Sequence, residues 1–580
     1  MRISTTFQRA ICVTNCIYLT YNGTVVIMNI KSLAIAAACH LVLAATVSAG
    51  TASVDPLTVY DQPSLKGTSA TIPETHTIYI DGSIPGGMND KISSFRLEQG
   101  YMAVLSTDSD GMGLGKTFIA SDAPLTVDAL PANLDNAVSW IRVMPWRQTL
   151  KKGLGSTDSK TPGVVNTAWY YHWGVSPPHG NQEDHKWGEY VPMPRKLESH
   201  PPTAFWVERI VDMKYPTHVF VYNEVDSKDD EKVPLVLERF SPFQKTGLRL
   251  GSPSGREQAA RFEDSFTPKF MRECDARGIR VDLTCMHWYD RNKKSVDDPE
   301  RIFTRFKNYL SRAYHYCGRR PLAITEFNCG PPRSREIQDA FLKRALPYLE
   351  ACGYVERYAW FQPRGGNGDF FDKDGKITST GLIYKNHVST PAYVPNRMPA
   401  GMNSYDVGAS EQSGQVIHAN GTFTVSGKGA AFDGTADECQ FAYTPITGDC
   451  AITARLFDMI ALEESNARAG IMIRDNLDAN SSLAAMLMTW EGARFQYRTK
   501  AGAPSDHVSD TKISAPMWLR VVRSGDTLSG YTSADGNTWS LLSSQTVTMD
   551  SKVFLGMAVS QQDPKNGYFS DAIFTDLKID

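Results

Sequence analysis

The feature that most constrains the fold of this chain is a regular alternation of strand-like and helical segments between residues 163 and 390. Apolar side chains recur at helical spacing over residues 302–313, after the N-capping pair Asp298-Pro299, and again over residues 337–349. Apolar strand-like runs lie before, between and after these helices: Val219–Tyr222, Leu248–Gly251, Ile279–Met286, Leu322–Glu326 and Val355–Phe361. The alternation predicts a parallel α/β fold, and its length of about 225 residues fits a (β/α)₈ TIM barrel.

Two stretches rich in Gly, Ser or Pro, residues 148–163 and 388–403, lack periodicity and are typical of linkers on either side of this block. The segment before it, 54–147, contains a repeat in which residues 89–97 align with residues 135–143. In each copy an Asx pair is followed by alternating polar and apolar residues, which predicts a half-buried strand. Two such units predict a small β-sandwich.

The last segment, 404–580, has short β-branched and aromatic runs separated by turn dipeptides such as Asn420-Gly421 and Asp535-Gly536. It lacks long helical periodicity, so an all-β sandwich is expected. The sequence therefore predicts a multi-domain protein with domains at 54–147, 163–390 and 404–580.

Residues 28–49 have the layout of a secretory signal peptide, with a short basic segment, the apolar run Leu33–Val47 and small residues for cleavage near Ala49. The apolar run is shorter than the roughly 18–20 residues that span a bilayer. We therefore expect a secreted, extracellular protein with no membrane partner.

The charge balance and the cysteines narrow the class of protein further. The 60 basic and 63 acidic residues leave a net charge of −3, so no basic excess indicates a nucleic-acid partner. None of the ten cysteines forms a C-x-x-C pair. Cys439 and Cys450 are close enough in sequence to bridge in an oxidising compartment. We expect a monomer that needs no cofactor for catalysis.

Two glutamates follow strand-like runs in the central block. Glu224 comes directly after Val219–Tyr222, and Glu326 ends the run that begins at Leu322, 102 residues later. Three βα-units of about 31 residues predict a spacing of roughly 94, so the two strand ends lie nearly across the mouth of a barrel. A facing carboxylate pair is what glycoside hydrolysis requires, since one member donates a proton and the other acts as nucleophile or base.

Aromatic and histidine side chains are concentrated at the ends of the same strand-like runs. The candidates for contact with a sugar are Trp169, Tyr171, His287, Tyr289 and Trp360. Core layers of a barrel favour Val, Ile and Leu, whereas an aromatic rim suits sugar rings, which stack their C–H faces on aromatic faces. Simple core packing of some of these rings remains the alternative.

Several motifs in order resemble the glycosyl hydrolases of the alkali-sensitive linkage protein type, whose characterised enzymes are endo-β-1,3-glucanases. The matching elements lie at residues 168–173, 190–193, 223–226, 252–253, 287–289, 324–327 and 358–361. The resemblance implies a retaining mechanism in which Glu224 on the fourth strand is the acid/base and Glu326 on the seventh is the nucleophile. It also implies that Asn223 contacts the sugar 2-hydroxyl. One departure is Val225, where the family usually has proline.

The flanking segments resemble two kinds of β-module. Residues 54–146 are similar to a βγ-crystallin domain, which implies calcium ligands at Asp90, Ser93, Asn136 and Ser139. A plain turn at each Asx pair is the alternative. Residues 404–580 are similar to the concanavalin-like jelly-roll modules of glycosidases, as a sugar-binding module or as a spacer.

The expected activity is therefore that of a secreted retaining endo-glycosidase acting on a polysaccharide substrate, β-1,3-glucan. Two alternatives remain open at this stage. One is an endo-glycanase on another polysaccharide, such as mannan or galactan, because specificity depends on loops. The other is a non-catalytic glycan-binding or adhesive protein with a degenerate barrel.

Overall fold

A computed structural model describes residues 55–580 apart from twelve short segments: 156–160, 178–187, 198–201, 227–231, 257–258, 291–297, 331–332, 362–365, 411, 430–431, 461–466 and 562–567. The chain divides into two compact units, Met1–Val54 and Asp55–Asp580. In the first, only the backbone of a three-stranded antiparallel sheet is described, with strands β1 (Ile11–Val13), β2 (Cys16–Tyr21) and β3 (Thr24–Asn29). Residues 30–49 of the predicted signal peptide lie outside the described residues. Within the described part, no helix has the length and apolarity that crossing a membrane demands.

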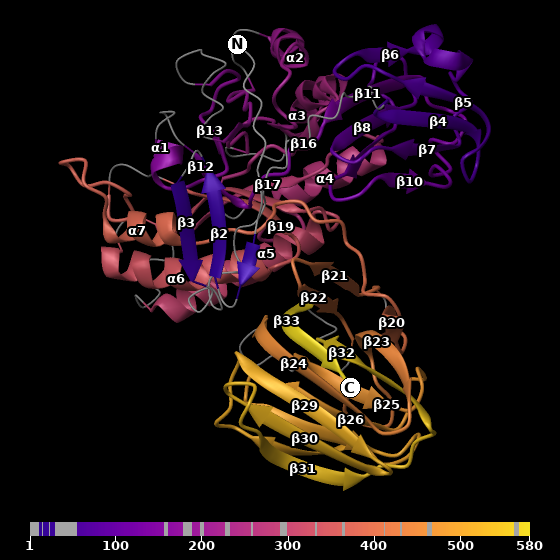
Figure 1. Cartoon of the computed structure of the whole chain (residues 1–580), viewed down its shortest axis with the longest axis vertical. Helices are drawn as coiled ribbons and strands as arrows, with labels where there is room; N and C mark the ends of the chain where they lie inside the picture. Colours follow the sequence, from indigo (N-terminus) through magenta and orange to yellow (C-terminus); the bar gives the residue numbers. More distant parts are fainter. Residues whose placement is uncertain are drawn as a thin grey trace. The chain divides into compact units, whose positions relative to one another are not determined.

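Residues 55–145 form two four-stranded antiparallel sheets (Figure 1). One sheet has the order β10 (Leu125–Val127), β7 (Ser94–Leu97), β4 (Leu57–Gln62) and β5 (Lys66–Ile72). The other has the order β6 (Ile78–Ile80), β11 (Trp140–Pro145), β8 (Tyr101–Ser106) and β9 (Gly115–Ala120), with two short 3₁₀ turns at Asp81–Ser83 and Pro85–Gly87. The two copies of the sequence repeat supply β7 and β11, one to each sheet. Apolar side chains of both sheets share one core, which agrees with the predicted sandwich.

The central block contains eight parallel strands in two hydrogen-bonded groups. The six-stranded group has the order β14 (Glu189–Tyr190), β13 (Trp169–Tyr171), β12 (Lys152–Gly155), β19 (Val355–Trp360), β18 (Leu322–Asn328) and β17 (Thr284–Tyr289). The two-stranded group consists of β15 (His218–Phe220) and β16 (Arg249–Gly251). The Phe220 amide donates to Pro192 O, just beyond β14, at 3.0 Å, and Gly251 bridges in parallel to Leu283, just before β17. Each edge of the shorter group is therefore joined to an edge of the longer one.

Seven helices and one 3₁₀ segment alternate with these strands among the described residues: α1 (Thr161–Val164), α2 (Thr203–Val211), α3 (Val233–Phe240), η6 (Ser241–Thr246), α4 (Phe266–Ala276), α5 (Pro299–Tyr316), α6 (Arg335–Ala351) and α7 (Ser379–Asn386). The two longest begin at side-chain caps, because Asp298 accepts from Glu300 N at 2.9 Å and Ser334 accepts from Ile337 N at 3.5 Å. Helices α5, α6 and α7 lie side by side (Figure 1), as the strand–helix alternation predicts.

The interpretation of residues 148–163 as a linker is wrong, because Lys152–Gly155 form β12, between β13 and β19. Gly153 is required there, since a Cβ at this position would lie 2.0 Å from the Trp169 ring. Lys151 and Lys152 also interrupt the apolar pattern by which a buried strand is predicted. Lys151 Nζ donates to three carbonyls at the end of α6, and Lys152 Nζ donates to carbonyls at the end of α7, so each completes a helix C-terminus.

The third parallel strand is β14, a two-residue strand that the apolar runs of the sequence do not predict. Counted from β12, β15 is the fourth strand and β18 the seventh. The predicted strand numbers of the two glutamates therefore hold.

Residues 403–580 form two seven-stranded antiparallel sheets, in agreement with the all-β prediction. The first has the order β20 (Asn403–Val407), β23 (Cys439–Thr447), β32 (Lys552–Ser560), β25 (Arg468–Arg474), β26 (Leu483–Met488), β27 (Ala493–Arg498) and β28 (Asp506–Asp510). The second has the order β21 (Gln415–Ala419), β22 (Thr422–Gly427), β33 (Ser570–Ile579), β24 (Cys450–Met459), β29 (Met517–Ser524), β30 (Thr527–Ser533) and β31 (Ser540–Thr546). An apolar core contains side chains of both sheets. Cys439 and Cys450 are buried and free, so the predicted disulfide is wrong.

Candidate active site

Glu224 and Glu326 are carried by the ends of the fourth and seventh parallel strands. Glu326 lies within β18 and its side chain is 5% exposed, whereas Glu224 follows β15 and its side chain is 36% exposed. The backbone at Glu224 has a φ of 51°, and its amide donates to Ser254 O at 2.7 Å. A left-handed conformation at a non-glycine residue costs free energy and is frequent at functional sites.

The two carboxylates meet at His287, a buried residue of β17. His287 Nδ1 lies 3.4 Å from Glu224 Oε1 and 3.4 Å from Glu326 Oε2. One oxygen of each carboxylate and one ring nitrogen all lie within 4.8 Å of one another. Burial alone would lower the pKa of His287, but the charges of Glu326 and Glu224 outweigh it and raise that pKa. The two carboxylates therefore stabilise the imidazolium form of His287 relative to the neutral ring.

Two tyrosine hydroxyls hold the Glu326 carboxylate. Tyr289, the last residue of β17, donates to Glu326 Oε2 at 2.5 Å. Tyr171 donates to Thr325 O at 2.9 Å and approaches Glu326 Oε1 at 3.4 Å. Burial, together with the charge of Glu326, raises the pKa of both phenols, so both remain protonated donors. Glu326 is thus fixed in orientation, while the more exposed Glu224 faces solvent.

Two predicted sugar contacts, Trp169 and Trp360, are wrong. Trp169 is fully buried beneath Tyr171, and its Nε1 donates to Lys151 O at 2.9 Å. Trp360 is fully buried on the other face of its strand, where its ring packs 5.2 Å from Phe327 and its Nε1 donates to Gly368 O. Both rings belong to the core and lie away from the carboxylate pair.

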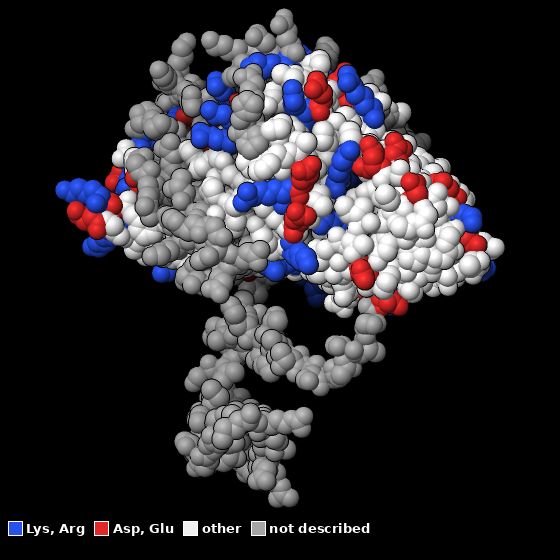
Figure 2. All heavy atoms as spheres, turned by 90° about the horizontal axis from the view of Figure 1, so that it is seen from above, with Lys and Arg blue, Asp and Glu red and all other residues white. Residues whose placement is uncertain are grey.

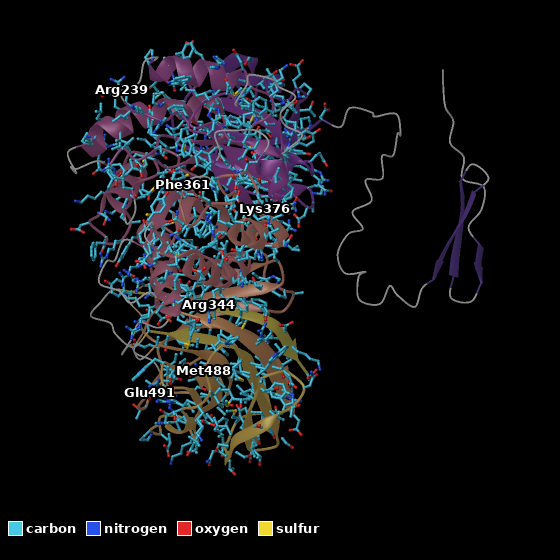
Figure 3. All side chains as sticks on the ribbon, turned by 90° about the vertical axis from the view of Figure 1, so that its left-hand side faces the viewer. Arg239, Arg344, Phe361, Lys376, Met488 and Glu491 are labelled. Atoms are coloured by element: carbon cyan, nitrogen blue, oxygen red, sulfur yellow. The ribbon has the colours of Figure 1, made fainter. Side chains whose placement is uncertain are left out.

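Two aromatic residues outside the predicted set of sugar contacts lie beside the tyrosines that hold Glu326. The Trp173 ring lies 5.5 Å from Tyr171 and 5.8 Å from Phe361, and the Phe361 ring lies 5.8 Å from Tyr289. Both are partly exposed, and Phe361 is labelled in Figure 3. Strand alternation could have found them, because Trp173 is two residues beyond Tyr171 and Phe361 is one beyond the outward-facing Trp360.

The residues on either side of Glu224 differ in burial and in hydrogen bonding. The side-chain oxygen of Asn223 is buried and has no hydrogen-bond partner among the described residues, which leaves it available to a ligand. Val225 is buried in the apolar core. Asp226 Oδ1 accepts from Arg256 N at 2.9 Å, so a hydrogen bond fixes the turn where the family has proline.

The four predicted calcium ligands of the N-terminal sandwich lie together in two pairs. Ser139 Oγ donates to Asp90 Oδ1 at 2.8 Å, and Ser93 Oγ donates to Asn136 Oδ1 at 3.3 Å. Asp90 and Asn136 have matching left-handed backbones, with φ of 52° and 54°. Each pair joins one repeat to the other, and every donor is an oxygen, so the residues present fit a hard cation such as Ca²⁺.

Comparisons with known proteins agree on the central block. Residues 154–384 match the family model described as glycosyl hydrolase catalytic core. Alkali-sensitive linkage protein 1 of Schizosaccharomyces pombe is 24% identical over 246 residues, which cover 40% of this chain and 42% of that protein. This chain therefore spans less than half the length of that relative.

Two solved structures resemble separate parts of the chain. A GH128 (subgroup I) endo-beta-1,3-glucanase from Amycolatopsis mediterranei in complex with laminarihexaose is 24% identical, covers 41% of this chain and 98% of its own, and has a TM-score of 0.35. A betagamma-crystallin domain from Flavobacterium johnsoniae is 31% identical and covers 16% of this chain and 96% of its own, with a TM-score of 0.14. Residues 154–384 are thus a domain of the glycosyl hydrolase catalytic core family, in a chain homologous to the alkali-sensitive linkage protein.

Proposed function

We propose that this protein is a secreted, retaining endo-glycosidase that hydrolyses β-1,3-glucan, with a (β/α)₈ barrel as its catalytic domain. The observation that supports it most directly is the approach of Glu224 and Glu326, whose oxygens lie within 4.8 Å of each other and of His287 Nδ1. Carboxyl groups about 5–5.5 Å apart are typical of retaining enzymes, whereas inverting enzymes need about 6.5–9.5 Å to admit a water. The separation therefore favours retention.

The different surroundings of the two carboxylates assign their roles. Glu326, oriented by Tyr289 and Tyr171, attacks the anomeric carbon and forms a glycosyl ester. Glu224 gives its proton to the leaving glycosidic oxygen, which departs as a hydroxyl group. Glu224 then removes a proton from water, and that water displaces Glu326 from the sugar with a second inversion. The partial exposure of Glu224 suits this second step, because the water must reach it.

The substrate would lie against the partly exposed rings of Trp173 and Phe361, which offer flat apolar faces beside Glu326. The buried oxygen of Asn223 would accept a hydrogen bond from a sugar hydroxyl next to Glu224. On the face seen in Figure 2, basic and acidic side chains are interspersed, and neither sign forms a continuous field, which suits an uncharged polymer. The choice of β-1,3-glucan rests on the family motifs.

Hydrolysis of a panel of polysaccharides tests the proposal. We expect the wild type to release oligosaccharides from laminarin, with β-anomers seen first by NMR, and to leave mannan and galactan intact. Glu326→Gln and Glu224→Gln should each lose several orders of magnitude in kcat. Initial release of α-anomers would refute retention. Full activity of Glu326→Gln would refute the site, and cleavage of mannan or galactan instead of laminarin would replace the substrate.

Three further parts of the proposal concern the rest of the chain. Secretion rests on residues 28–49, and the expected product is a monomer that lacks them. Ca²⁺ would be held by the oxygen pairs Asp90–Ser139 and Asn136–Ser93, and would stabilise the N-terminal sandwich without taking part in hydrolysis. The C-terminal β-region would be a jelly roll, either as a sugar-binding module or as a spacer.

A further inference from the structure

Tyr289 at the end of β17 donates a short hydrogen bond to Glu326 of β18. Just beyond this bond, the side chain of Arg333 joins the ends of the two strands. Arg333 Nη1 donates to Asp290 O, directly after β17, at 2.5 Å and to Cys329 O, directly after β18, at 2.6 Å. Its Nη2 lies 3.0 Å from Asp290 Oδ2. The Arg333 side chain is 5% exposed, so these charge-assisted bonds are shielded from water.

The two strand ends are also in close backbone contact at this point. A Cβ on Gly330 would lie 2.7 Å from Asp290 O, so a larger residue there would force the ends apart. Gln338 of α6 holds the β18 side, because its Oε1 accepts from Cys329 N at 3.2 Å and its Nε2 donates to Gly330 O at 3.2 Å. The backbone pairing of the two strands ends at Tyr289 and Asn328. Just beyond it, with the β18 end fixed by Gln338, the Arg333 side chain ties the β17 end to the β18 end.

The residue before Asp290 is Tyr289, whose hydroxyl donates to Glu326 Oε2 at 2.5 Å. In the paired strands, His287 lies beside Glu326 and Tyr289 lies beside Asn328. A shift of the β17 end relative to β18 therefore changes this hydrogen bond directly. A bond this short is sensitive to small displacements, and misplacement of about 1 Å can cost about 10²-fold in rate.

We propose that Arg333 is a positioning residue of the hydrolysis, which sets the Tyr289–Glu326 hydrogen bond by clamping the ends of β17 and β18. The predicted effects on rate rest on the proposed function. The predicted effect on the Tyr289–Glu326 hydrogen bond does not depend on it. The planar fork of the guanidinium reaches a carboxylate and two backbone carbonyls together, which the single ammonium of lysine cannot do in the same geometry.

Arg305 of α5 provides a matched control. It binds the same carboxylate from the helix side, with Nε 3.3 Å from Asp290 Oδ1, and its side chain is 29% exposed. Removing Arg305 thus removes one cation from Asp290 but leaves the clamp between Asp290 O and Cys329 O in place. If the loss of kcat came only from removing a cation from Asp290, it would appear in both Arg333→Met and Arg305→Met.

The experiment is a double-mutant cycle in the full-length protein with Arg333→Met, Tyr289→Phe and the combined variant, beside Arg305→Met. We expect Arg333→Met to lower kcat on laminarin about 10- to 100-fold with a less than threefold change in KM. The acidic limb of its pH profile should move to higher pH, as in Tyr289→Phe. The combined variant should be no slower than Tyr289→Phe, because both changes remove the same interaction. Arg305→Met should keep the wild-type limb.

Multiplicative losses in the combined variant, or an unmoved acidic limb in Arg333→Met, would overturn the proposal. If Arg333→Met does not fold, Arg333→Lys keeps the charge without the fork and should show the same limb shift. The ¹³C chemical shift of the Glu326 carboxyl is measured without hydrolysis, and it should change alike in Arg333→Met and Tyr289→Phe. That readout separates failure of the positioning role from failure of the proposed glucanase activity.

Discussion

Replacing Tyr289 by phenylalanine tests whether its short hydrogen bond to Glu326 contributes more to kcat/KM than the longer contact of Tyr171. Tyr289 donates to Glu326 at 2.5 Å, while Tyr171 approaches the other carboxylate oxygen at 3.4 Å and makes its better hydrogen bond to Thr325 O. A hydrogen bond to a charged group contributes about 1.5–3 kcal/mol. At about 1.36 kcal/mol per tenfold change in rate, Tyr289→Phe should lower kcat/KM about 10- to 150-fold.

Tyr171→Phe is the matched control, because it removes a hydroxyl from the same carboxylate at the longer distance. Its loss in kcat/KM on laminarin should be less than about tenfold, since contacts of 3.4 Å are at the weak end of hydrogen bonding. Circular dichroism and thermal unfolding of both variants check that the fold is retained. An equal or greater loss in Tyr171→Phe would refute the argument that hydrogen-bond length at Glu326 sets the rate.

Three other predictions concern substrate, metal and acid. Trp173→Ala should raise KM for laminarin about tenfold or more with little change in kcat, in steady-state kinetics, because it removes an apolar surface that contributes about 1.5–3 kcal/mol and no reacting group. Excess Ca²⁺ should raise the melting temperature of the wild type, and Asp90→Ala should abolish that increase in differential scanning calorimetry. Between pH 5 and pH 3 the free energy of unfolding in urea should fall, and Glu356→Gln should reduce that fall. Burial opposes ionisation of Glu356, but the Arg249 guanidinium outweighs it and lowers the pKa to about 2. A carboxyl whose pKa is lowered by folding stabilises the protein above its unfolded pKa of about 4.5, and this stabilisation is lost as the pH falls toward 2.

Sequence analysis placed Glu224 and Glu326 at the ends of the fourth and seventh strands because its evidence was local and periodic. A glutamate that follows an apolar run is visible without any tertiary information, and the spacing of βα-units relates Glu224 to Glu326. The strand β12 was invisible for the opposite reason. Its residues, Lys152-Gly153-Leu154-Gly155, offer one large apolar side chain, so no apolar run marks a strand. Only the carbonyls at the ends of α6 and α7 make buried lysines at 151 and 152 acceptable.

The predictions of Trp169 and Trp360 as sugar contacts failed because they rested on the presence of aromatic residues near strand ends and not on the burial of each ring. Trp169 and Tyr171 share one face of β13, and Trp173 follows two residues beyond the strand. Position along the chain decides which ring can reach a substrate, because Trp169 and Tyr171 are fully buried whereas Trp173 is partly exposed. Trp360 lies on the opposite face, and its neighbour Phe361 turns toward Tyr289. The face could be worked out from alternation, but the depth depends on where each strand begins, which the sequence leaves uncertain by several residues.

The parallel strands of the central block carry two sets of charged and polar groups, one at the starts of the strands and one at their ends. At the starts of their strands, Glu189, His218, Arg249, Glu356 and Arg357 form a buried network of ion pairs and hydrogen bonds. At the opposite ends stand Glu326, Tyr289 and, beyond β15, Glu224.

An apolar layer separates the two sets of charged groups. It contains buried apolar side chains of the parallel strands, among them Phe220, Cys285, Ala323 and Ala359. A protonation event among the paired charges at the strand starts therefore changes the free energy of unfolding, while the carboxylates at the strand ends respond to the substrate. It follows that Glu356→Gln should alter acid stability and leave the shape of the pH–rate profile unchanged. A shift of that profile in the variant would mean that the apolar layer does not insulate the catalytic carboxylates.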